Sequence, residues 1–81
     1  MRNEIITKVK QVIAQGFTDA DCGIFFTRNE VNDPMETAYK DDDIQIDICY
    51  HYSYFEIFGL TEDEQEVIAS YYHRLRERRH A

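Results

Sequence analysis

The sequence predicts a two-layer α+β domain, with two helices packed on one face of an antiparallel sheet of two or three strands. Apolar residues recur at helical spacing near both ends of the chain, the middle alternates apolar and polar residues, and turn-forming residues separate these segments. The expected order is helix, strand, strand, strand, helix. With 81 residues the chain has room for one hydrophobic core, so residues 1–81 are expected to form a single domain.

The first helix is predicted over Glu4–Gln15. Asn3 suits the N-cap position, and Gly16 suits the left-handed residue that commonly ends a helix. Apolar residues at three- and four-residue spacing form its buried face: Ile5, Ile6, Val9, Val12, Ile13 and Phe17.

Two short strands are predicted next, over Cys22–Arg28 and Met35–Tyr39. Thr18–Asp21 is expected as a polar connection before them, and Asn29–Pro34 between them is dense in turn-forming side chains. Both faces of the first strand are partly apolar, so the pattern leaves open which face is buried.

The central strand is predicted within Ile44–Leu60. Its polar face, which includes Asp47, is expected to meet solvent, and Lys40–Asp43 is expected as an exposed tight turn before it. A platform for stacking nucleic-acid bases is the alternative use of its tyrosines, but the surrounding charge is negative, so core packing is favoured. The residues on its apolar face alternate with polar ones: Ile44, Ile46, Ile48, Tyr50, Tyr52 and Tyr54.

The last helix is predicted over Glu62 to about Arg78. Thr61 and Glu64 have the spacing of a capping box, in which each side chain accepts a hydrogen bond from the backbone of the other residue. Acidic residues in the first turn and arginines near the end complement the helix dipole.

Charge is unevenly distributed along the chain. The net charge is −7, yet residues 19–66 carry fourteen acidic residues against Arg28 and Lys40, and both flanking segments are net positive. A segment this acidic repels nucleic acid and attracts basic protein surfaces. The sequence therefore disfavours direct binding of nucleic acid.

No motif for catalysis, metal binding or cofactor binding is complete. The aspartates at 41–43 lack the glycine and glutamate of a calcium loop, and Cys49 and His51 lack a second pair of zinc ligands. We expect a protein that is not an enzyme and has no cofactor, catalytic residue or metal ligand. Metal-assisted hydrolysis by His51 and the aspartates is the enzymatic alternative.

The expected location is the cytoplasm. The sequence has neither the ~18-residue apolar stretch of a membrane span nor the apolar core of a signal peptide, so no membrane contact is expected. Cys22 and Cys49 are therefore expected as free thiols rather than a disulfide.

Four short strings carry a resemblance to a known group of proteins. Thr27–Asn29, Asp33–Met35, Ile46–Tyr50 and Tyr54–Thr61 resemble segments of short, uncharacterised acidic proteins from phages and mobile elements of gut bacteria. In size and charge such proteins are similar to anti-CRISPR proteins, some of which block nuclease complexes by imitating nucleic acid. The resemblance implies no catalytic residues.

These observations together predict a small acidic inhibitor. Its expected partner is a protein with a basic surface, such as a CRISPR or other nuclease complex, whose nucleic-acid-binding surface it would occupy by charge mimicry. The alternative is a self-associating structural or regulatory subunit of a mobile-element complex, a homodimer for example. The residues expected to bind the partner are Asp33, Glu36, Tyr39, Asp41, Asp42, Asp43 and Asp47.

Overall fold

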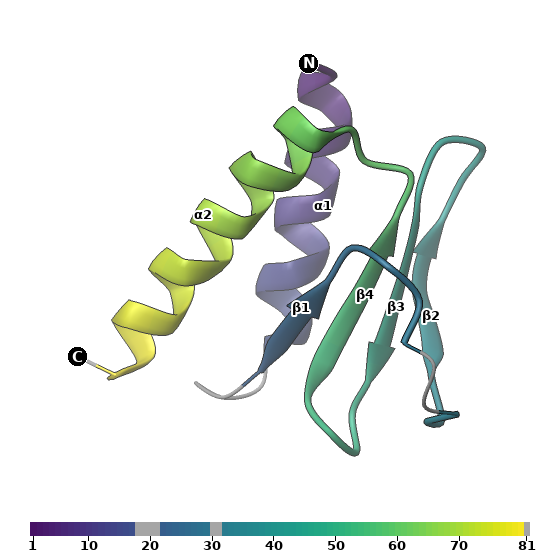
Figure 1. The fold of residues 1–81 in the computed structure, drawn as a ribbon. Coiled ribbons are helices and arrows are strands. Elements are labelled where there is room, and N and C mark those ends of the chain that lie inside the picture. The colour runs from purple at the N-terminus through teal and green to yellow at the C-terminus, as the bar shows by residue number, and fades with distance from the viewer. Residues whose placement is uncertain (18–21, 30–31, 81) are drawn as a thin grey trace.

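The structure, a computed structural model, describes residues 1–17, 22–29 and 32–80. It confirms the α+β class, with one helix before the sheet and one after it (Figure 1). The elements are α1 (Asn3–Gly16), β1 (Gly23–Phe25), β2 (Glu36–Lys40), β3 (Gln45–Cys49), β4 (Tyr54–Phe58) and α2 (Glu62–His80). Within the described residues the sheet has four strands, in the order β1-β4-β3-β2, rather than two or three.

The predicted central strand consists of two strands, β3 and β4, joined by a turn at residues 50–53. The two strands are antiparallel, and Ile46 lies opposite Ile57. Ser53, which has a φ of 53°, takes a left-handed conformation as the chain enters β4. The alternation of apolar and polar residues continues through the turn, so spacing alone does not reveal it.

Tyr50 and Tyr52 correct the prediction that the tyrosines of this segment belong to the core. Their side chains are 56% and 58% exposed. Tyr54 is buried, but it lies opposite Cys49 on the other face of the sheet from Ile46 and Ile48, so its predicted place on their face is also wrong. Both exposed tyrosines lie in the turn, beyond the last paired residues of β3 and β4, so neither packs within the sheet.

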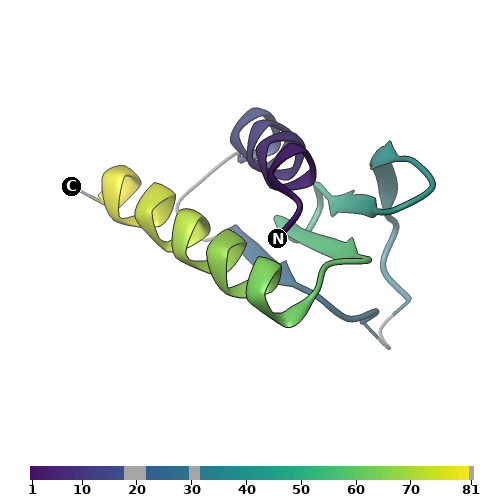
Figure 2. The same ribbon diagram turned by 90° about the horizontal axis from the view of Figure 1, so that it is seen from above.

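The sheet is mixed, and the prediction of a wholly antiparallel sheet is wrong. β1 pairs with β4 in parallel, with Gly23 opposite Tyr54, whereas β2–β3 and β3–β4 are antiparallel. The described parts of the connection from β1 to β2, residues 26–29 and 32–35, lie over the sheet face that the helices leave open, and the two strands are at opposite edges of the sheet (Figures 1 and 2). β1 has only three residues, and the alternation of apolar and polar side chains in so short a strand does not indicate which strand it pairs with.

The core lies between the sheet and the two helices, as predicted. Seen from above, α1 and α2 lie on the same side of the sheet (Figure 2). The side chains on that face of β3 and β4 are fully or almost fully buried, as are those that α1 and α2 contribute. This cluster includes Val9, Ile13, Ile46, Ile48, Phe55, Ile57, Ile68 and Tyr72.

The helix ends test three predictions from the sequence. The capping box of α2 is confirmed: the Thr61 amide donates to Glu64 Oε1 at 2.9 Å, and the Glu64 amide donates to Thr61 Oγ at 3.3 Å. Asn3, in contrast, is the first residue of α1, and the N-cap, Arg2, makes no side-chain capping bond. Gly16 is the last helical residue, without the left-handed φ that the sequence suggested.

The edges of the sheet also differ slightly from prediction. β1 covers only Gly23–Phe25. Cys22, just before it, is buried toward α2, and its carbonyl accepts a hydrogen bond from the Tyr72 hydroxyl of that helix. β2 begins and ends one residue later than predicted, and its pairing with β3 contains a bulge between Thr37 and Tyr39. Thr18–Asp21 lie outside the described residues.

Over the part of the chain that the structure describes, neither helix combines the length and the apolar character that crossing a membrane requires. Cys22 and Cys49 are free thiols, as predicted, and both are buried.

Candidate protein-binding surface

The predicted acidic turn joins β2 to β3, and Asp41 organises it. Asp41 Oδ1 accepts hydrogen bonds from the amides of Asp43 and Ile44, both at 2.8 Å. Asp41 Oδ2 accepts a hydrogen bond of 2.8 Å from the Tyr39 hydroxyl. Asp and Asn side chains stabilise turns in this way, by accepting from amides two or three residues further along the chain.

These hydrogen bonds change the ionisation of both partners. The Ile44 amide, the Tyr39 hydroxyl and the Asp43 amide lower the pKa of Asp41 below its ordinary value. The bond to Asp41 raises the pKa of Tyr39. Asp41 is therefore a fixed, ionised carboxylate that holds the turn, while Asp42 and Asp43 are exposed beside it.

The turn and the start of α2 lie at the same end of the molecule (Figure 1). Gly59, which precedes α2, packs so closely against the backbone of Asp43 that a Cβ atom there would overlap the Asp43 carbonyl oxygen. This contact joins the segment that leads into α2 to the backbone of the β2–β3 turn. We call the exposed carboxylates of the two turns the acidic end: Asp41, Asp42, Asp43, Glu62 and Asp63.

A buried carboxylate ties the N-terminal residues to the first turn of α2, and the Arg2 cation that it binds is partly exposed near Asp41 and Asp43. Glu64, which is fully buried, accepts from Arg2 Nη2 at 2.6 Å, from Arg2 Nε at 3.0 Å and from the Arg2 backbone amide at 3.0 Å. Arg2 Nη2 also donates to the Gly59 carbonyl at 2.8 Å. The bonds from Arg2, followed by that from Thr61, hold the pKa of Glu64 well below its ordinary value.

Glu64→Gln is expected to lower the free energy of unfolding, and this loss should be larger at neutral pH than at acidic pH. Because the pKa of Glu64 is depressed in the folded state, its ionisation stabilises the fold fully above the unfolded-state value near 4.5 and progressively less as the pH falls below it. The difference in the free energy of unfolding between wild type and variant, measured by urea denaturation, should therefore shrink steadily as the pH is lowered from 6 to 3. Glu62→Gln, at an exposed position two residues away, is the control and should show little difference at any pH.

Asp47 does not join the acidic end. The sequence places it on a solvent-exposed sheet face, but its side chain is only 5% exposed, and Gln45 donates to its carboxylate at 3.0 Å. Asp33 and Asn29, in the connection from β1 to β2, lie over this face. The Asn29 amide donates to Glu56, which lies opposite Asp47 on β4 and is also buried. Asp47 is therefore unavailable as a first contact for a partner.

Asp33 and Glu36 lie toward the other end of the sheet from the acidic turn. Asp33 accepts a hydrogen bond of 2.6 Å from the Tyr54 hydroxyl, and this bond raises the pKa of Tyr54 to about 12. Glu36 is exposed and lies opposite Ile48, at the end of β2 farthest from Asp41. Of the seven predicted residues, the structure thus gathers Tyr39 and the three aspartates at 41–43.

The sequence analysis missed part of this surface. The sequence predicts that Glu62 and Asp63 complement the helix dipole, and nothing in their spacing indicates that the segment before them contacts the β2–β3 turn. Gly59 was a clue, because a glycine next to a helix start often marks a left-handed residue; its φ is 98°.

The opposite end of α2 is basic. Arg74 and Arg78 are exposed there, and the guanidinium of Arg76 lies 5.8 Å from the centre of the Tyr72 ring. At about 1.5 Å per residue, the nineteen residues of α2 separate its acidic and basic ends by roughly 28 Å. The molecule is therefore electrically polar along this helix.

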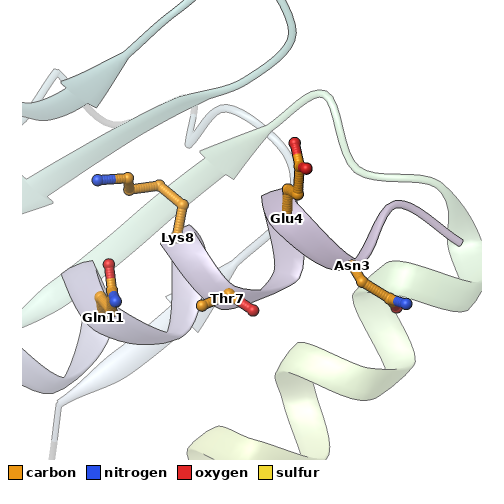
Figure 3. Close-up of a pocket in the computed structure, with 5 residues that line it drawn as sticks. All are labelled: Asn3, Glu4, Thr7, Lys8 and Gln11. Carbon is orange, nitrogen blue, oxygen red and sulfur yellow. The ribbon is translucent and has the colours of Figure 1, made fainter.

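Other candidate sites have less support. Among residues 1–17, 22–29 and 32–80, no three His, Cys, Asp or Glu side chains are grouped so that they could hold a metal ion. A surface depression of about 360 Å³ on α1 is lined by side chains of that helix alone, and these fan outward rather than converge (Figure 3). It is lined by Asn3, Glu4, Thr7, Lys8 and Gln11.

Comparison of the chain with protein-family models, with curated proteins and with solved structures finds no match.

Proposed function

We propose that the protein is a small acidic inhibitor that occupies the basic, nucleic-acid-binding surface of another protein by charge mimicry. The observation that carries the proposal is the acidic end, where two turns distant in sequence both carry exposed carboxylates and the Gly59–Asp43 backbone contact links the segments that hold them. Arginine and lysine side chains that normally hold phosphates form charge-assisted hydrogen bonds with such carboxylates. A CRISPR or other nuclease complex is the partner class that this chemistry and the sequence resemblance favour.

The rigidity of the acidic end supports this function. Asp41 is fixed by three hydrogen bonds, and Gly59 packs the β2–β3 turn against the start of α2. Because the Asp41 carboxylate and the backbone of the turn are held in place before binding, ordering them costs little conformational entropy when a partner docks. Tyr39 contributes to this order through its hydroxyl and is a support for the turn, with its ring beneath Lys8 at 5.2 Å.

Self-association is the second candidate, and the polarity of α2 favours it. The basic end of one copy could contact the acidic end of the next and form a head-to-tail assembly. Light scattering over a range of protein and salt concentrations separates the two candidates, since a monomer at all concentrations removes this one.

The double variant Asp42→Lys/Asp43→Lys is expected to weaken binding of a basic partner at least about tenfold. It spares Asp41, whose replacement would disrupt the turn itself. The measurement is affinity capture from a lysate that contains candidate nuclease complexes, followed by release with competing DNA or RNA and an assay of nuclease inhibition.

The matched control is Glu66→Lys/Glu77→Lys, which introduces the same charge change at two exposed positions on α2 outside the acidic end. It should bind like wild type. Equal capture by wild type and Asp42→Lys/Asp43→Lys at moderate salt, or capture that nucleic acid does not release, would contradict charge mimicry.

A further inference from the structure

A recess of about 190 Å³ opens at the β2 edge of the sheet, on the side that the helices cover. Its walls come from the second half of α1, from β2 and β3, and from the turn between β3 and β4. Pockets that bind drug-sized ligands have volumes of roughly 300–1,000 Å³, so this recess is of a size for one side chain. Its lining includes Val12, Gln15, Ala38, Ile48, Tyr50 and Phe55.

The bulge in β2 accounts for the position of this recess. Ala38 is the unpaired residue between Thr37 and Tyr39, and its small side chain leaves space at the edge of the sheet. A bulge changes the direction in which side chains point. Here it allows Ala38 to lie on the same side of the sheet as Tyr39, the residue that pairs with Ile46.

An aromatic ring lines the recess, and an acid lies on the strand position opposite one of its lining residues. Glu36 lies opposite Ile48, so both side chains project on the same side of the sheet with their Cβ atoms about 4.5–5.5 Å apart. Because Ile48 lines the recess, the exposed Glu36 carboxylate is within reach of its mouth. Tyr50, more than half exposed, adds a ring to the wall.

We infer that this recess receives an arginine side chain of the bound protein. The aliphatic stem of the arginine contacts Val12, Ala38 and Ile48, its guanidinium stacks on the Tyr50 ring, and Glu36 accepts its hydrogen bonds. This inference rests on the proposed function, since it places one basic side chain of the partner in a specific position about a strand's length from the acidic end. It also gives Tyr50 and Glu36 a shared role.

The test uses a hexa-arginine peptide as the probe and nuclear magnetic resonance of the labelled protein as the readout. We expect the methyl signals of Val12, Ala38 and Ile48 to shift on titration with this peptide. Hexa-citrulline, which has the same shape without the charge, should cause no such shifts. Shifts confined to the amides of Asp42 and Asp43, with unchanged methyl signals at the recess, would overturn the inference.

Two variants examine the recess separately. Glu36→Gln should weaken binding at the recess several-fold to about tenfold, because one charge-assisted hydrogen-bond acceptor is lost. Ala38→Leu, at an exposed position where folding should be preserved, fills the recess and should abolish the Ile48 shift. Glu66→Gln, which removes the same charge from α2, is the control and should leave these shifts unchanged.

The outcomes distinguish this inference from the proposed function. Loss of the methyl shifts in Ala38→Leu with retained capture of the basic protein would support the recess as an auxiliary contact. Capture that depends on Asp42 and Asp43, combined with wild-type shifts in both recess variants, would overturn the recess and leave charge mimicry intact. An equal effect of Glu66→Gln and Glu36→Gln would also overturn it, since binding would then follow net charge alone.

Discussion

Gly59→Ala is expected to lower the free energy of unfolding by more than about 2 kcal/mol, because two separate effects add. The φ of 98° at this position is one that a side chain strains. In addition, the new Cβ would overlap the Asp43 carbonyl oxygen and lie 3.2 Å from the Ile44 Cα. Both neighbours are backbone atoms, so the clash can be relieved only by moving the β2–β3 turn away from α2.

Urea denaturation of Gly59→Ala and Gly23→Ala provides the measurement and its control. At Gly23 a Cβ would meet the Tyr54 Cβ at 3.4 Å, an ordinary contact, and φ is not positive. Gly23→Ala is therefore expected to change stability by less than about 1 kcal/mol. Similar losses in the two variants would show that Gly59 does not lock the acidic end.

Phe55→Ala is expected to cost about 3–5 kcal/mol, a large part of the roughly 4–12 kcal/mol that stabilises a domain of this length. Phe55 is fully buried near the start of β4, on the side that both helices cover. Removing its ring leaves a cavity next to Gly16, whose neighbours include two Phe55 ring carbons.

Phe25→Ala is the matched control, because it removes the same atoms from a side chain that is 48% exposed. Its loss should be below about 1.5 kcal/mol, the upper range of the edge-to-face contact that Phe25 makes with Tyr54. Thermal or chemical denaturation checks both values. A loss for Phe55→Ala no greater than that for Phe25→Ala would contradict the assignment of the core.

The local parts of the fold were predictable because their signals are short in range. The capping box from Thr61 to Glu64 and the apolar spacing of both helices depend only on residues a few positions apart, and the structure confirms them. The pairing of β1 was not predictable, since Gly23 pairs with Tyr54 and no local pattern specifies a partner so far along the chain. The turn at 50–53 has no signal in the spacing, because apolar and polar residues alternate through it; the core-facing positions change from Ile46 and Ile48 to Phe55 and Ile57 only after it.

The same distinction holds for the candidate surface. The exposed turn at residues 41–43 follows from consecutive aspartates, which repel one another and favour solvent. The burial of Asp47 does not follow from its position in an alternating strand, because a distant connection covers that face. Arg2 as the counterion of Glu64, 62 residues away, likewise has no sequence signal.

The bonding of Arg2 to Glu64 determines where the protein can be tethered for capture experiments. Because the Arg2 backbone amide itself donates to Glu64, a segment fused ahead of Met1 would start one residue from that bond and next to the acidic end. The end of α2 lies far from it, on the other side of the molecule (Figure 1). An affinity handle or surface linkage attached there leaves the carboxylates facing outward, whereas an N-terminal one would mask the surface under test.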